Sequence, residues 1–193
     1  MYDLHSILIQ LKKEDTPLHG VMVRCVRCFY QWLDPTLWEG SALFELWAQE
    51  LELIYGDLRQ RLSPNAKTDA GSLGDRFGFD TPPELPRLLQ SIQTFYSVLI
   101  KLIAWNILRG ATPEPPLTEL LSGRAFVNRG IRNFCGDDWY IWPLDIWDPA
   151  LETQCEELRA CLESFDTCPE GSTLSPDSLS RIYETVVPPA LRH

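Results

Sequence analysis

The stretch LPRLLQSIQTFYSVLIKLIAWNILR, from Leu85 to Arg109, decides the fold that the sequence predicts. Its large apolar side chains recur at spacings of three and four residues, which places them along one broad stripe of an α-helix. Gly110 follows directly and is typical of the position after a helix end. Ahead of the stretch, Thr81 and Glu84 have the spacing of a capping box. We therefore expect a long central helix over about residues 84–109, capped at its start by Thr81 and Glu84.

The same apolar spacing recurs along much of the remaining chain. Pro17 and Gly20 predict a loop between the first two helices, and Asp148-Pro149 and Ser175-Pro176 each pair a capping residue with a first-turn proline. The predicted helices cover residues 3–12, 21–33, 41–62, 117–122, 148–164 and 175–186.

Strand patterns are restricted to short pieces around residues 139–144, where Pro143 interrupts any helix. The fold class that follows is all-α, an irregular bundle of about six to eight helices around the long central one. We expect a single helical domain over residues 1–193. Within it, a flexible, glycine-containing loop at 63–80 separates a subregion at 1–62 from one at 81–193.

Composition favours a soluble protein of the cytoplasm. The 193 residues are 45% hydrophobic, which is ample for a buried core. We expect no membrane span, because no uninterrupted apolar run reaches about 18 residues, and the N-terminus has no signal-peptide pattern.

The charge is unevenly distributed. Of the net −10, residues 111–193 contribute −8, with 14 acidic and 6 basic side chains. Such a field opposes nonspecific binding to nucleic acid, because affinity for a duplex comes largely from Lys and Arg at phosphates. Any contact with DNA is therefore expected to be local.

Three stretches, taken in order, resemble the N-terminal region of large adenine-specific DNA methyltransferases of restriction and phage-defence systems. The first is residues 93–104, QTFYSVLIKLIA, and the second runs from LLSGRAF at 120–126 through GIRNF at 130–134 to DWYIW at 138–142. The third is IYETVVPPALRH at 182–193, which resembles the approach to the cofactor domain of that family. The likeness covers roughly residues 41–62 and 85–193.

The resemblance implies a noncatalytic helical domain that serves a catalytic domain as scaffold, regulator or docking surface. S-adenosylmethionine is the cofactor that the resemblance implies for the parent enzyme, and no cofactor is expected in this chain. An amino methyltransferase needs an Asn or Asp followed by two prolines and an aromatic residue to hold a flipped adenine. The pairs at 82–83, 115–116 and 188–189 are followed by Glu84, Leu117 and Ala190 instead. The partners implied are a catalytic methyltransferase domain or another defence protein, with DNA contacted through the parent enzyme.

Lys101 is one candidate contact residue, because it lies among apolar residues of the central helix and an ammonium is costly to bury unpaired. We expect its head to reach water or a carboxylate. The alternative is contact with a phosphate or with the catalytic domain. Arg124, Arg129 and Arg132 form a basic cluster in the acidic third of the chain. They are candidates for phosphate or partner contact, and the alternative is a solvated surface or ion pairing with Asp137 and Asp138.

Trp139, Trp142 and Trp147 belong to an aromatic block with acidic neighbours. These acids argue against stacking on bases, so we expect the block to plug the core or to form an interdomain packing surface.

Two other functions remain open. The net charge suits a free-standing acidic interaction protein, such as a DNA mimic whose carboxylates line one surface. Cys25-Val26-Arg27-Cys28 would serve a thiol enzyme only with an exposed thiol of low pKa at a helix start, and buried structural cysteines are the expected alternative. No metal site is expected from the cysteines and histidines, and no catalytic set of residues is evident.

Overall fold

The computed structural model describes residues 4–34, 46, 47, 49, 74–135, 140–165 and 176–187. All regular secondary structure within these residues is helical, which confirms the predicted all-α class. The predicted helix at 41–62 and loop residues 63–73 lie outside the described residues, except for Leu46, Trp47 and Gln49.

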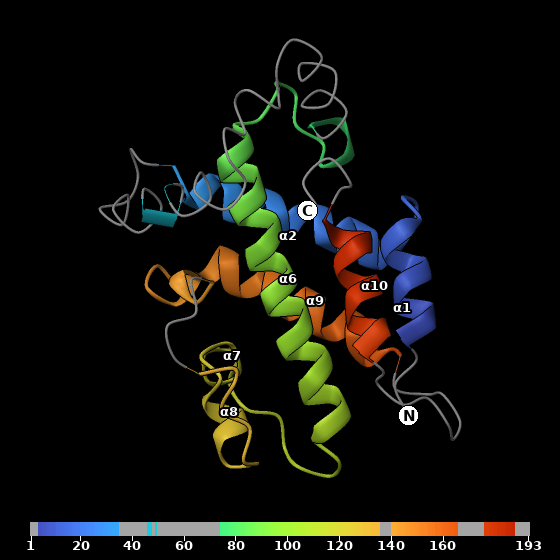
Figure 1. Cartoon of the computed structure of the whole chain (residues 1–193), viewed down its shortest axis with the longest axis vertical. Helices are drawn as coiled ribbons and strands as arrows, with labels where there is room; N and C mark the ends of the chain where they lie inside the picture. The colour runs from blue at the N-terminus through green and yellow to red at the C-terminus, as the bar shows by residue number, and fades with distance from the viewer. Residues whose placement is uncertain are drawn as a thin grey trace.

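The long helix α6, Leu85–Leu108, is the axis of the bundle, within two residues of its predicted bounds (Figure 1). Helices α2, Pro17–Trp32, and α9, Pro149–Glu163, pack against each other and against α6. On another side, α1, Leu4–Lys12, lies beside α10, Pro176–Val186, which also contacts α6. The short helices α7, Leu117–Leu121, and α8, Arg124–Val127, pack together near the C-terminal half of α6.

Helix α6 is long and apolar enough to cross a membrane by length and composition alone, in contrast to the expectation of no such segment. In its most apolar window, 61% of the residues are buried inside the protein. The core helix of a soluble protein has these same properties, so the arrangement is compatible with a soluble protein. Among the described residues, one continuous apolar core surrounds α6.

Two buried hydroxyl groups of α6 find partners within the chain. Thr94 Oγ1 accepts a 2.9 Å hydrogen bond from the indole nitrogen of Trp142, and the Ser91 hydroxyl donates to the carbonyl of Arg87 at 2.7 Å. Both serine and threonine are fully buried. Because an unmet polar group in such a core costs about 1–3 kcal/mol, these contacts offset the cost of burying a helix of mixed composition.

Helix α2 begins four residues earlier than predicted, at Pro17 rather than Val21. Thr16 is its N-cap and accepts from the backbone nitrogen of His19, while Pro17 suits the first turn. Gly20 therefore lies inside the helix. The predicted loop is wrong because it gave Gly20 too much weight. A glycine within a helix costs about 1 kcal/mol of helix stability, and the full burial of Leu18 offsets this cost.

The predicted capping box at Thr81 is wrong, because α6 starts at Leu85 with Glu84 as its N-cap. Prolines at 82 and 83 disfavour helical backbone at the residue before each of them. The backbone nitrogen of Glu84 instead donates to the hydroxyl of Tyr30 at 2.9 Å. Arg87 completes this junction by donating to the carbonyl of Tyr30 at 2.6 Å, which fixes the end of α2 to the start of α6.

Other predicted boundaries agree with the structure. The side chain of Asp148 caps α9 by accepting from Leu151 N at 2.7 Å, and α10 ends at Val186 as expected. Short strand pieces were considered for residues 139–144. Within that segment, Trp142–Leu144 form one turn of 3₁₀ helix, η1. The ring of Pro143 prevents a regular α-helix there. Trp139 lies outside the described residues.

Gly123 allows the turn between α7 and α8 to meet the chain at Phe134. Its φ is +80°, and a Cβ placed there would lie 1.9 Å from the carbonyl oxygen of Phe134. Gly130 has a similar φ of +78°, but no atom lies within 4 Å of a Cβ at that position. A side chain at Gly130 would therefore meet backbone strain alone, whereas a side chain at Gly123 would meet both backbone strain and a steric clash.

We expect Gly130→Ala to lower the free energy of unfolding by about 1 kcal/mol, the usual cost of left-handed backbone for a non-glycine residue. Gly123→Ala adds a clash with backbone atoms and should cost more than about 3 kcal/mol. Urea denaturation of both variants checks this pair. Equal losses would contradict the close approach at Phe134.

Candidate functional site

A pocket of about 520 Å³ opens beside the middle of α6. Gln93, Ser97 and Lys101 lie four residues apart on the helix, so their side chains share one face and form its polar wall. Tyr96 and Ile100 flank this line. The other walls come from Tyr183 on α10, from Tyr140 and from residues 133–135, and the contact between Gly123 and Phe134 holds the last of these in place.

The aromatic and amide groups of the pocket are ordered by mutual contacts. The hydroxyl of Tyr140 donates to Oε1 of Gln93 at 2.8 Å. Tyr96 and Tyr183 meet edge to face with ring centroids 5.4 Å apart. Burial, and to a smaller extent the neighbouring Tyr183, raise the pKa of Tyr96, so its hydroxyl stays protonated at neutral pH.

Lys101 is 2% exposed and donates from Nζ to the carbonyl of Leu121 at 2.8 Å. Of the two environments expected for its head, water and a carboxylate, water is wrong, because the buried ammonium binds a backbone carbonyl. Leu121 is the last residue of α7, where carbonyls have no partner within the helix and the dipole favours a cation. The lysine thus stabilises the end of α7 and places a positive charge beside the pocket.

The three predicted arginines do not act as one basic patch. Arg129 binds the end of α6, donating to the carbonyls of Leu108 and Arg109, and its guanidinium carbon lies 5.3 Å from the ring centroid of Trp105. Arg124 and Arg132 are exposed. Asp137 and Asp138, the predicted ion-pair partners, lie outside the described residues.

Of the predicted tryptophans, Trp142 lies inside the chain's own core. It is 1% exposed, and its ring meets Phe29 edge to face at 5.9 Å in addition to its bond with Thr94. Trp147 is partly buried against the same core. The described part of the aromatic block therefore joins η1 to α2 and α6.

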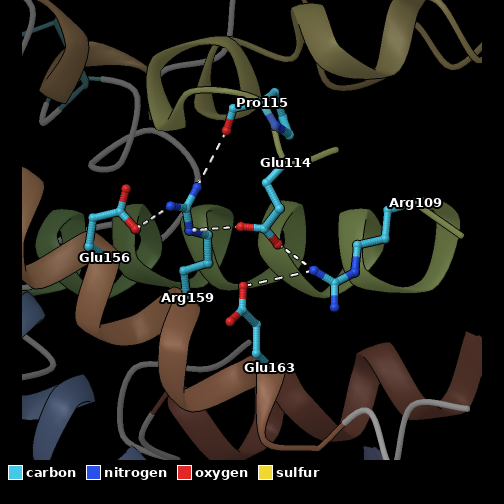
Figure 2. Close-up of polar contacts among 6 residues, drawn as sticks. All are labelled: Arg109, Glu114, Pro115, Glu156, Arg159 and Glu163. Carbon is cyan, nitrogen blue, oxygen red and sulfur yellow. Dashed lines mark hydrogen bonds and ion pairs between the residues drawn. The ribbon is translucent and has the colours of Figure 1, made fainter. Parts of the chain in front are cut away.

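An ion-pair network connects the C-terminal half of α9 to the segment after α6 (Figure 2). Glu114 lies between Arg109, at 2.5 Å, and Arg159, at 3.3 Å. Arg159 also contacts Glu156 at 2.5 Å, and Arg109 contacts Glu163 at 3.8 Å. Burial, and then the hydrogen bond and charge of Glu114, raise the pKa of Glu163.

These pairs bear on the predicted DNA mimic, which needs carboxylates free to face a basic partner. On α9, Glu156 and Glu163 belong to the network, and Glu157 pairs with Arg24 of α2 at 2.6 Å. Three of the four acids of this helix are therefore paired with arginines of the same chain, which does not favour a mimic.

Cys25 and Cys155 have the properties of core residues. Cys25 is 1% exposed, and its thiol faces the carbonyl of Gln154 at 3.5 Å. Burial raises the pKa of Cys25 well above its ordinary value, that of Cys155 to about 12 and that of Cys28 to about 11. A reactive thiolate needs the opposite shift, so the thiol-enzyme alternative is not favoured. Within the described ranges, no group of three or more His, Cys, Asp or Glu side chains is placed to hold a metal ion.

Sequence reasoning singled out Lys101 but missed the rest of the pocket. The regular spacing of Gln93, Ser97 and Lys101 within an apolar helix was a usable signal for a polar stripe. Asn133, Tyr140 and Tyr183 carried no such signal, because each comes from a different segment and only the fold brings them to α6.

The chain matches no known protein-family profile, no curated protein and no solved structure.

We expect the buried thiols to make stability fall at alkaline pH. An unfolded chain ionises Cys155 near the ordinary pKa of 9.0, whereas the folded chain keeps the proton until about pH 12. Stability from the protonated thiol is therefore complete below pH 9 and is lost between pH 9 and 12, at up to about 1.4 kcal/mol per pH unit.

Urea denaturation under reducing conditions between pH 7 and 11 should show a shallower decline for Cys155→Ala than for the wild type. Val26→Ala also removes core volume but no thiol, so it should keep the wild-type decline. A Cys155→Ala decline as steep as that of the wild type would contradict the prediction.

Proposed function

We propose that this chain is a noncatalytic helical module of an adenine-specific DNA methyltransferase, and that it holds the start of a catalytic domain that uses S-adenosylmethionine. The sequence resemblance supplies the family, and the anchoring of α10 supplies the mechanical role. We place the module in the cytoplasm, with the catalytic domain or another defence protein as its partner.

The observation that carries this proposal is that the C-terminal end of α10 is buried and held by contacts with other elements. Ile182, Val186 and Val187 are fully buried, and α10 packs against both α1 and α6. Arg76 donates from Nη2 to the carbonyl of Thr185 at 2.7 Å, which satisfies one of the last carbonyls of the helix. A segment that leaves this helix therefore starts from a fixed position.

The residues that follow α10 are those that resemble the approach to the cofactor domain, Pro188 to His193. In the proposed enzyme, the bundle sets where that approach begins, and it thereby orients the catalytic domain. Such positioning matters to catalysis, because misplacement by about 1 Å can cost about 100-fold in rate.

The distribution of charge supports an organising role. A net charge of −10 opposes contact with the duplex, and Arg129 is committed to the end of α6. We assign the binding of DNA to other parts of the proposed enzyme, and local contact through Arg124 and Arg132 remains a smaller part of the proposal.

The test starts with the native reading frame. We expect it to continue after the codon for His193 into a glycine-containing cofactor segment and an Asn/Asp-Pro-Pro-aromatic motif. In that full-length product, Arg76→Met should lower the rate of adenine methylation about tenfold or more while the Kd for S-adenosylmethionine stays unchanged.

Arg181→Met is the matched control, because this exposed arginine lies on α10 itself and its loss should keep the wild-type rate. A reading frame that ends at His193 with no such motif in a neighbouring gene would count against the proposal. Equal rates for Arg76→Met and Arg181→Met would reject the positioning role.

A further inference from the structure

We propose that the pocket beside α6 binds a single nucleobase carried by a nucleoside or nucleotide. The inference rests on the shape and chemistry of the pocket and does not depend on the proposed methyltransferase. Its volume of about 520 Å³ lies within the range of small-molecule sites and suits one nucleotide.

The tyrosines provide surfaces on which a planar ring can stack. Tyr96, Tyr140 and Tyr183 line the pocket from three different segments, and all three are partly buried. The edge-to-face contact between Tyr96 and Tyr183 holds both rings in fixed orientations. Base–aromatic stacking contributes about 1–3 kcal/mol per base and accepts any base, since each base has a π-face.

Two amides supply hydrogen bonds to the edge of such a ring. Because Oε1 of Gln93 accepts from Tyr140, its Nε2 is oriented as a donor. Asn133 is exposed, lines the pocket and has a donor and an acceptor of its own. Side-chain amides of Asn and Gln match the paired donor and acceptor of an adenine edge.

The charge around the site favours a short ligand over a long strand. Lys101 is the one charged side chain among the described residues that line the pocket, and it is 2% exposed with its ammonium bound to the carbonyl of Leu121, so its charge can act on a ligand only from behind the pocket wall. The net charge of −10 repels a polyanion over the rest of the surface. One phosphate is compatible with both properties, whereas a tract of phosphates is not.

Isothermal titration of the 193-residue chain with adenosine, AMP and a single-stranded oligonucleotide tests the inference. We expect adenosine and AMP to bind with Kd values below about 1 mM. Asn133→Ala should weaken binding about three- to tenfold through loss of a hydrogen bond. Tyr183→Leu should weaken it about tenfold through loss of stacking.

Asn128→Ala is the matched control, because this exposed asparagine belongs to the same connecting region but does not line the pocket. It should keep wild-type affinity, and thermal unfolding confirms that each variant is folded. If the oligonucleotide alone binds, with the same dependence on Asn133 and Tyr183, the base comes from a strand, and the proposal of a nucleoside or nucleotide ligand is overturned. No binding by any of the three probes, or binding that both pocket variants leave unchanged, would overturn it.

Discussion

The burial of α6, in which 14 of 24 residues are buried, is the constraint on which the rest of the structure depends. Polar side chains buried in such a helix cannot reach water, so a partner within the chain lowers the cost of burying them. Trp142 serves Thr94, and the end of α7 serves Lys101. These two bonds hold η1 and α7 against α6. Tyr140, which lies just before η1, forms part of the pocket wall.

Arginines perform a related task at the ends of helices. Arg129 binds the last carbonyls of α6, Arg76 binds one at the end of α10, and Arg87 joins the end of α2 to the start of α6. Carboxylates on α9 and Glu114 in turn bind Arg109 and Arg159. Many of the charges that suggest a binding surface in the sequence therefore stabilise the fold. This use of charge supports the proposal of an organising role over the proposal of direct contact with DNA.

Sequence patterns predicted those features that depend on neighbours along the chain. The apolar spacing of α6 and the pairing of Asp148 with Pro149 gave boundaries close to those observed, because period and capping are local properties. Tertiary contacts account for the errors. Tyr30 takes the backbone nitrogen that the capping box was expected to use, and Leu121 takes the ammonium of Lys101 that was expected to reach water. Only the polar stripe of α6 could be predicted of the pocket, since Asn133, Tyr140 and Tyr183 meet α6 only after the bundle forms.

Hydrogen exchange of the 193-residue chain in detergent-free buffer tests the central role of α6 most directly. If α6 is the buried axis of a soluble bundle, its amides between Ile92 and Ile103 should be the slowest in the described part of the chain. Their exchange should require a free energy equal to that of global unfolding measured with urea. Exchange of these amides about 100-fold or more faster than those of α2 and α9, or a chain that stays in solution only with detergent, would contradict the account.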